Sequence, residues 1–162
     1  MNEIPHTRRR LVIGYGNPGR RDDGLGPALA EAVAARAGPG VETDADYQLT
    51  VEDAAALSGC DEVIFADAST DGPEPFSFAA LEPAAGADFT THHISPGAVL
   101  ALAGELFDAR PKAWLMGIRG YEFNEFGEGL SAGARRNLAA AADFLSARLR
   151  DGPTERRTEA AT

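Results

Sequence analysis

The chain has 162 residues, 44% of them hydrophobic, which is enough for one globular domain with its own core. Its formal net charge is −10, so nucleic acid and anionic membranes would repel it, and we expect neither as a partner. The one cysteine, Cys60, excludes an intramolecular disulfide and a cysteine metal cluster. The sequence shows no signal peptide and no transmembrane stretch, so we expect a cytoplasmic protein.

Short apolar runs alternate with helical stretches along the chain. In chain order, the sequence predicts a strand over residues 10–15, a helix over 25–37, a strand over 41–47, a short helix over 50–57, a strand over 62–66, an edge strand over 76–81, a helix over 96–107, a strand over 112–118 and a helix over 131–150.

This alternation predicts a mostly parallel sheet covered by helices on both faces. The expected fold class is α/β: a single-domain, three-layer α/β/α architecture in which residues 76–81 can add an antiparallel edge strand. We expect the domain to cover residues 1–150. Residues 151–162 are polar and include glycine and proline, so we expect a disordered tail there.

Three helix starts carry capping signals. Thr50 and Asp53 form a box-like start, and Ser95 is followed by a proline at the favoured first helical position. For the first helix, the expected N-cap is Asp22 or Asp23.

A glycine-rich turn, Gly14-Tyr-Gly-Asn-Pro-Gly19, follows the first strand and satisfies the dinucleotide-binding pattern G-x-G-x-x-G. In that pattern the helix begins within the glycines, so that its free amides meet the pyrophosphate. Here a proline and a glycine interrupt the start of the helix, and Asp22 and Asp23 would place negative charge against a phosphate. Because Asp44 lies near the end of the next strand, a nucleotide- or small-ligand-binding domain stays open as the alternative function.

Candidate functional side chains occur at three places next to predicted elements. Asp23 follows the first strand, Asp67 ends the third, and His92 and His93 lie in the loop before the helix of residues 96–107. Loops at the C-terminal ends of parallel strands converge on one edge of the sheet, so two carboxylates and an imidazole can meet there. Such a set suits a divalent metal such as Zn²⁺ or Ni²⁺. Each residue also has an ordinary explanation, as a helix cap, a turn residue or a solvated loop histidine.

The stretch Gly14-Tyr-Gly-Asn17 followed by Asp22-Asp-Gly-Leu-Gly26 resembles the opening motif of the hydrogenase maturation endopeptidases. Val63-Ile-Phe-Ala-Asp-Ala68 is similar to the second motif of that family, and residues 120–131 are similar to its C-terminal segment. The resemblance spans residues 11–149. It implies a protease that trims the C-terminal extension from the large subunit of a [NiFe] hydrogenase after nickel insertion, so the expected partner is the large-subunit precursor.

The resemblance also implies a metal-binding set of Asp23, Asp67 and His93. The second acidic position of the opening motif is the ligand in that family, which selects Asp23 over Asp22. His93-Ile-Ser-Pro96 fits the His-x-x-Pro form of the histidine loop, and His92 is the competing ligand. The implied metal is nickel carried by the substrate, while zinc or another divalent ion would suit the same residues.

The catalytic residues expected from this resemblance are Asp23 and Asp67. No G-x-S-x-G or His-Glu-x-x-His motif is present, and Cys60 has no base near it in sequence. The metal would polarise the scissile carbonyl or acidify an attacking water, and a carboxylate not bound to it would act as general base. Two carboxylates sharing a proton are a further option, ranked lower because the histidine then has no role. A chaperone that binds the precursor without cutting it is the remaining alternative.

Overall fold

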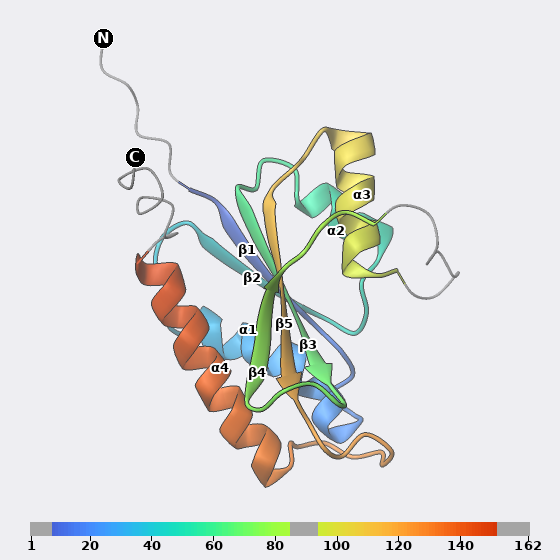
Figure 1. Cartoon of the computed structure of the whole chain (residues 1–162), viewed down its shortest axis with the longest axis vertical. Coiled ribbons are helices and arrows are strands. Elements are labelled where there is room, and N and C mark those ends of the chain that lie inside the picture. Colours follow the sequence, from blue (N-terminus) through green and yellow to red (C-terminus); the bar gives the residue numbers. More distant parts are fainter. Residues whose placement is uncertain (1–7, 85–93, 152–162) are drawn as a thin grey trace.

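The structure is a computed structural model that describes residues 8–84 and 94–151. Its centre is a five-stranded sheet with the order β2-β1-β3-β5-β4 (Figure 1). The strands are β1 (Arg10–Tyr15), β2 (Val41–Asp46), β3 (Glu62–Ser69), β4 (Phe76–Ala80) and β5 (Lys112–Arg119). Only β4 among them is antiparallel to its neighbour, so the expected mostly parallel sheet with an antiparallel edge strand is confirmed.

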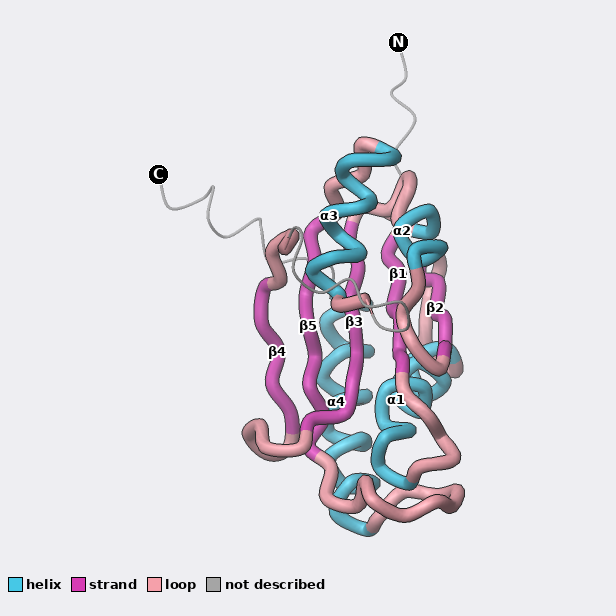
Figure 2. The backbone as a smooth tube through the Cα atoms, turned by 90° about the vertical axis from the view of Figure 1, so that its right-hand side faces the viewer, coloured by secondary structure: helices cyan, strands magenta, loops and turns pink. Residues whose placement is uncertain are grey.

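Helices cover both faces of this sheet. They are a 3-10 turn η1 (Arg21–Gly24), then α1 (Leu25–Ala34), α2 (Val51–Ala56), α3 (Pro96–Phe107) and α4 (Ala132–Asp151). Figure 2 shows α2 and α3 on one face, with α1 and α4 behind the strands on the other. The three-layer α/β/α architecture is therefore confirmed, and it leaves the C-terminal ends of the parallel strands as one open edge.

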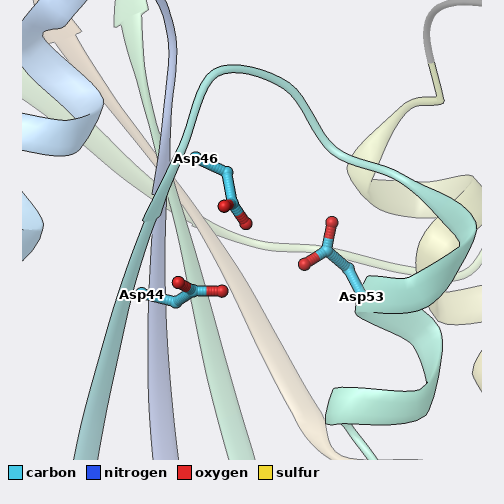
Figure 3. Close-up of side chains that lie close together, drawn as sticks. All are labelled: Asp44, Asp46 and Asp53. Atoms are coloured by element: carbon cyan, nitrogen blue, oxygen red, sulfur yellow. The ribbon is translucent and has the colours of Figure 1, made fainter.

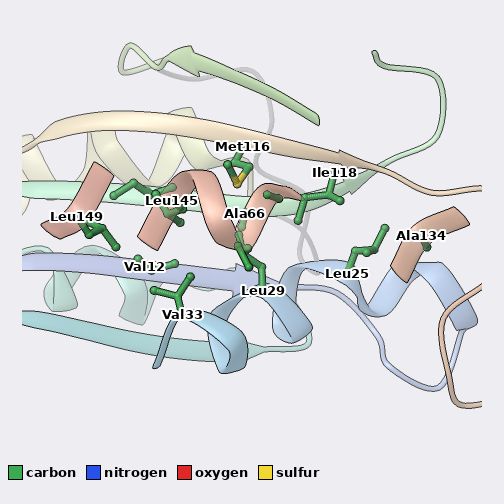
Figure 4. Packing of buried hydrophobic residues seen from close by; sticks show 13 residues of the cluster. Val12, Leu25, Leu29, Val33, Ala66, Met116, Ile118, Ala134, Leu145 and Leu149 are labelled. Carbon is green, nitrogen blue, oxygen red and sulfur yellow. The ribbon is translucent and has the colours of Figure 1, made fainter. Parts of the chain in front are cut away.

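Two apolar clusters, one on each side of the sheet, hold the layers together. Alternate residues of each strand point to opposite faces, so Val12 and Ile64 pack under α1 and α4, while Ile13 and Phe65 pack under α2 and α3. Figure 4 shows the first cluster, in which Leu29 of α1 meets the strand residues. This burial on both faces explains why the inner strands β1 and β3 contain continuous apolar runs in the sequence.

The helix caps agree with the sequence prediction at two starts and differ at the third. The Ser95 hydroxyl accepts a hydrogen bond from the Ala98 amide at 3.1 Å, and the Asp53 carboxylate accepts one from the Thr50 amide at 2.8 Å. The prediction that Asp22 or Asp23 caps the first helix is wrong: Gly24 is the N-cap of α1, and no side chain caps it. Both aspartates lie in the preceding turn η1, where Asp22 accepts hydrogen bonds from the loop of residues 120–131 and Asp23 accepts the nearby Asn17 amide.

Two element ends also differ from the sequence prediction. The first helix was expected to reach residue 37, but α1 ends at Ala34 and tightens into a turn in which the Arg36 amide donates to the Val33 carbonyl. Strand β3 continues to Ser69, so Asp67 lies inside the strand and not at its end. The extra residues of β3 pair with β5, up to Ser69 opposite Arg119.

Three glycines of the opening motif allow α1 to lie directly against β1. A Cβ on Gly14 would come within 2.0 Å of the Gly26 carbonyl oxygen, and one on Gly26 would come within 2.3 Å of the Tyr15 carbonyl oxygen. Gly16 adopts a φ of 142°, which side chains disfavour, and a Cβ there would meet the Asp23 carbonyl oxygen at 2.1 Å. These glycines thus have a packing role that needs no ligand.

Among the described residues, no helix is both long enough and apolar enough to cross a membrane. Helix α4 includes Asp151, the first residue of the predicted tail, and residues 152–162 lie outside the described part of the chain.

Candidate functional site

The predicted site residues that the structure describes, Asp23 and Asp67, line one pocket of about 490 Å³ at the carboxyl edge of the sheet. The loops after β1 and β2, the end of β3 and the start of the α3 segment surround it. Its lining consists of Tyr15, Gly16, Asn17, Arg20, Asp23, Tyr47, Gln48, Leu49, Asp67 and Ile94. Two carboxylates from separate motifs therefore meet at the edge where parallel sheets place ligands.

Asp23 is oriented by the turn that precedes it. Its Oδ2 accepts a hydrogen bond from the Asn17 amide at 2.9 Å, and the Asn17 side-chain oxygen accepts one from the Gly19 amide at 2.9 Å. The glycine-rich turn is folded around the carboxylate by these contacts. Asp23 is only half-buried, so the rest of its carboxylate can reach a ligand in the pocket.

Asp67 is held by contacts from its own strand and from β1. Its Oδ1 accepts a hydrogen bond from the Ala68 amide at 2.7 Å, and the Tyr15 hydroxyl donates a second bond to the carboxylate. Burial raises the pKa of Asp67 to about 6, and the neighbouring Asp23 charge adds to the shift, while the two hydrogen bonds oppose it. A carboxyl group with this pKa can exchange a proton near neutral pH.

Tyr15 is the residue of this site that sequence reasoning missed. It stands in the glycine motif, where a tyrosine looks like one more apolar strand residue, and only the pairing of β1 with β3 brings it to Asp67. Burial and the nearby Asp67 charge raise the pKa of Tyr15, so its hydroxyl keeps its proton and donates to the carboxylate.

Asp22, although adjacent to Asp23, points away from the pocket and is fully buried. Its Oδ2 accepts hydrogen bonds from the Tyr121 and Glu122 amides at 2.8 and 2.9 Å and from the Ser131 hydroxyl at 2.7 Å. Its Oδ1 accepts the Ser131 amide at 2.8 Å. Burial alone would raise the pKa of Asp22, but these bonds outweigh it and lower the pKa. Asp22 therefore attaches the loop of residues 120–131 to the opening motif.

The glycine-rich turn offers little to a phosphate, because its amides already have partners. The Gly16 amide donates to the Asp46 carbonyl at 3.0 Å, and the Asn17 and Gly19 amides donate to side-chain oxygens within the turn. The helix begins only at Leu25, after the two aspartates. The geometry does not favour the nucleotide-binding alternative.

The predicted histidine ligand, His93, and its competitor, His92, lie outside the described residues. Ile94 is the first residue described after this gap, and it lines the pocket. Among the described residues, the metal ligands available in the pocket are thus the carboxylates of Asp23 and Asp67. Two carboxylates suit a divalent ion that accepts oxygen ligands, and such an ion would need at least one more ligand.

A second acidic cluster lies beside the pocket and was not anticipated from the sequence. Asp44 and Asp46 project from the same side of β2 because they are two residues apart, and they face Asp53 at the start of α2 (Figure 3). Carboxylate oxygens of all three lie within 4.8 Å of one another. Burial and the Asp44 charge raise the pKa of Asp46 to about 6. Asp53 also accepts the Thr50 amide, so it has a structural role at the helix start.

The single cysteine takes no part in this site. The Cys60 thiol donates to the Glu62 carbonyl at 3.1 Å, and burial raises its pKa. A thiol with a raised pKa is a poor nucleophile, in agreement with the sequence analysis.

Solved hydrogenase maturation proteases share the architecture described above. A [NiFe] hydrogenase maturation protease HycI from Thermococcus kodakarensis superimposes with a TM-score of 0.69 at 22% identity, covering 88% of this chain and 92% of the other. For the hydrogenase maturating endopeptidase HybD from E. coli, the TM-score is 0.68 at 23% identity, with 88% and 93% of the chains covered. A hydrogenase 2 maturation peptidase from a Thaumarchaeota archaeon gives a TM-score of 0.62 at 23% identity and covers 85% and 96%.

These likenesses establish the fold that the sequence motifs had suggested. No protein-family model matches the chain, and neither does any curated protein. At such identities the activity must be argued from the site.

Proposed function

We propose that this chain is an endopeptidase that removes the C-terminal extension of a [NiFe] hydrogenase large-subunit precursor after nickel has been inserted. One observation carries the proposal: Asp23 and Asp67, from separate motifs, face one pocket on a fold shared with solved hydrogenase maturation proteases. The precursor is the partner in this proposal, and the reaction takes place in the cytoplasm, as expected from the sequence.

Nickel belongs to the substrate in this proposal, and the chain supplies the residues that engage it. Asp23, Asp67 and His93 would bind the ion in the docked precursor, since two oxygens and one nitrogen suit a borderline divalent metal. Ile94, the residue that follows His93 in the sequence, lines the pocket. His92 is the competing ligand, and zinc or another divalent ion would fit the same donors.

The two carboxylates would carry the proton transfers of peptide hydrolysis. Nickel would polarise the scissile carbonyl or lower the pKa of the attacking water. A carboxylate that does not bind the ion would act as general base: Asp67, whose pKa is about 6 in the metal-free site, would take a proton from water and pass it to the leaving amine where Asp23 and the histidine hold the nickel. Asp23 lies close enough to raise the pKa of Asp67, so the pair can also share one proton. That second mechanism leaves the histidine without a role.

The experiment that tests this function is incubation with a nickel-loaded large-subunit precursor, in parallel with the nickel-free form, followed by intact mass measurement. We expect a discrete C-terminal fragment to be lost only from the loaded precursor. An unchanged mass with every loaded precursor tried, together with a stable complex, would favour a chaperone over a protease.

Variants of the site separate its members. We expect Asp23→Asn, Asp67→Asn and His93→Ala to abolish cleavage while the fold stays intact. Asp44→Asn is the matched control, because it removes a nearby carboxylate that does not line the pocket. If His92→Ala abolishes cleavage and His93→Ala does not, the histidine assignment shifts by one residue.

A further inference from the structure

The loop of residues 120–131 is fixed against the opening motif at two places. Asp22 accepts backbone amides from both ends of the loop, at Tyr121 and at Ser131. In the middle of the loop, the Gly127 amide donates to the Gly19 carbonyl at 2.8 Å, and the Arg21 amide donates to the Gly127 carbonyl at 3.0 Å. This loop therefore has a defined position beside the residues that lead into the pocket.

Phe126, at the tip of this loop, leaves 83% of its surface exposed. The Arg20 guanidinium lies over its ring at 5.0 Å from the centroid, and Arg20 itself lines the pocket that holds Asp23 and Asp67. We call Arg20 and Phe126 the aromatic ledge. The ledge is thus continuous with the wall of the pocket, and its ring is turned to solvent.

The chemistry of the ledge is that of a protein-binding hot spot. Arginine and large aromatic side chains dominate the energetics of protein–protein contacts. Among the described residues that line the pocket, Arg20 has the only positively charged side chain. Its guanidinium N–H donors lie in the plane of the group and form no hydrogen bond to another described residue, so carbonyl or carboxylate oxygens of a bound chain can approach them.

We propose that the aromatic ledge binds the polypeptide of the precursor next to its scissile bond, with an apolar side chain against Phe126 and a carbonyl or carboxylate group on Arg20. This inference rests on the proposed function and adds to it a contact that selects the substrate. Because the ledge would contact the polypeptide away from the atoms that react, it would bind the substrate equally in the ground state and the transition state. Loss of such binding raises KM and leaves kcat unchanged.

Steady-state cleavage of a nickel-loaded precursor tests the proposal. We expect Phe126→Ala to raise KM by about tenfold with kcat within about twofold of wild type, a typical result for the truncation of one hot-spot aromatic. Arg20→Met should raise KM as well. The double variant should raise it by less than the product of the two single effects, because both residues belong to one contact.

Leu106→Ala is the matched control, since Leu106 is an exposed apolar residue at the end of α3 and does not line the pocket. It should leave KM at the wild-type value. Thermal unfolding of Phe126→Ala should match wild type, because the ring is mostly exposed.

If the Phe126→Ala variant keeps the wild-type KM, the proposed substrate contact at the aromatic ledge is wrong, while the proposed protease function stands. A fall in kcat at constant KM would also overturn it, because the residue would then act in catalysis. Absence of cleavage by the wild-type protein would overturn the proposed function itself, and the ledge with it.

Discussion

At the residue scale, the opening motif contains two adjacent aspartates with opposite tasks. Asp22 is fully buried and accepts four hydrogen bonds from the loop of residues 120–131. Asp23 faces the pocket and accepts one, from the Asn17 amide. The 3-10 turn that contains both residues directs their side chains to different sides. The pair thus combines a structural attachment with a candidate catalytic carboxylate.

Asp67 should limit stability at neutral pH, because its burial disfavours the charged carboxylate. Its folded pKa of about 6 lies above the ordinary aspartate value of 3.8, so its contribution to stability is fully present below pH 3.8 and is lost as the pH rises through 6. We therefore expect Asp67→Asn to be more stable than wild type by about 1–2 kcal/mol at pH 8 and equal to it near pH 3.5. Chemical denaturation of the metal-free protein at both pH values measures this. A less stable variant at pH 8 would contradict it.

Tyr15 should act as a positioning residue for Asp67. Tyr15→Phe removes only the hydroxyl that donates to the carboxylate, so we expect cleavage of the precursor to fall about 10- to 100-fold, as is typical when a partner of a ligand is lost. Steady-state kinetics with the nickel-loaded precursor and an unfolding curve measure the two effects separately.

Tyr121→Phe is the control for Tyr15→Phe. It deletes a tyrosine hydroxyl that is hydrogen-bonded to Glu74 and Asn137. We expect a loss of stability of about 1 kcal/mol, with cleavage unchanged. Equal kinetic losses in the two variants would show that the effect of Tyr15 is merely structural.

At the scale of elements, Asp22 joins η1 to the segment between β5 and α4. Asp22→Ala leaves three backbone amides and the Ser131 hydroxyl without their acceptor, so we expect a destabilisation of about 3 kcal/mol or more. Asp23→Ala, with one hydrogen bond to lose, should cost about 1 kcal/mol. Urea unfolding of the two variants measures both losses of stability. Equal losses would contradict the role of Asp22 in holding the loop of residues 120–131.

Helix α4 is tied to the sheet by a buried ion pair. Arg148 donates two hydrogen bonds to Glu62 at 2.9 and 3.2 Å, and the Trp114 indole donates a third at 3.1 Å. Burial would raise the pKa of Glu62, but these contacts outweigh it and lower the pKa. We expect Arg148→Met to destabilise the protein by about 3 kcal/mol, because it removes the hydrogen-bonded partner of a buried carboxylate.

Two further variants test this ion pair. Adding Glu62→Gln to Arg148→Met should recover part of the loss, since the amide oxygen still accepts the Trp114 bond and carries no charge. Arg36→Met, which breaks the exposed pair with Asp143, should cost less than about 1 kcal/mol. Thermal unfolding of the three variants ranks their losses of stability. A double variant that is less stable than Arg148→Met would contradict the role of the buried Glu62 charge.

At the scale of the whole molecule, the acidic groups predict maximum stability in mildly acidic solution. Asp46 and Asp67 have folded pKa values of about 6, so the stability that they contribute is lost as the pH rises through 6. Asp22 and Glu62 have lowered pKa values, so their contribution to stability is present above the ordinary values of 3.8 and 4.5 and is lost at lower pH.

We therefore expect the free energy of unfolding to be greatest at about pH 4 and to fall by about 2 kcal/mol or more by pH 8, chiefly as the pH rises through 6. Unfolding curves across this range at fixed ionic strength measure the effect. Asp46→Asn should flatten the decline above pH 5, and an unchanged pH profile in that variant would contradict the assignment.

The sequence by itself determined the elements and their order. Continuous apolar runs indicated buried parallel strands, and β1 has the predicted bounds of residues 10–15. The capping residues Thr50 and Ser95 marked two helix starts because a cap acts within one turn of the backbone. Asp23 and Asp67 could be proposed as neighbours because strand order and the parallel arrangement bring their loops to one edge.

Tertiary structure alone decided which side chains meet. The contact of Tyr15 with Asp67, the attachment of residues 120–131 to Asp22 and the cluster of Asp44, Asp46 and Asp53 join segments that no local pattern connects. The capping prediction failed for Asp22 for the same reason, since a buried carboxylate with four distant partners gains more from them than from a helix end. Secondary structure follows from interactions over a few residues, whereas the site depends on strand register and packing between layers.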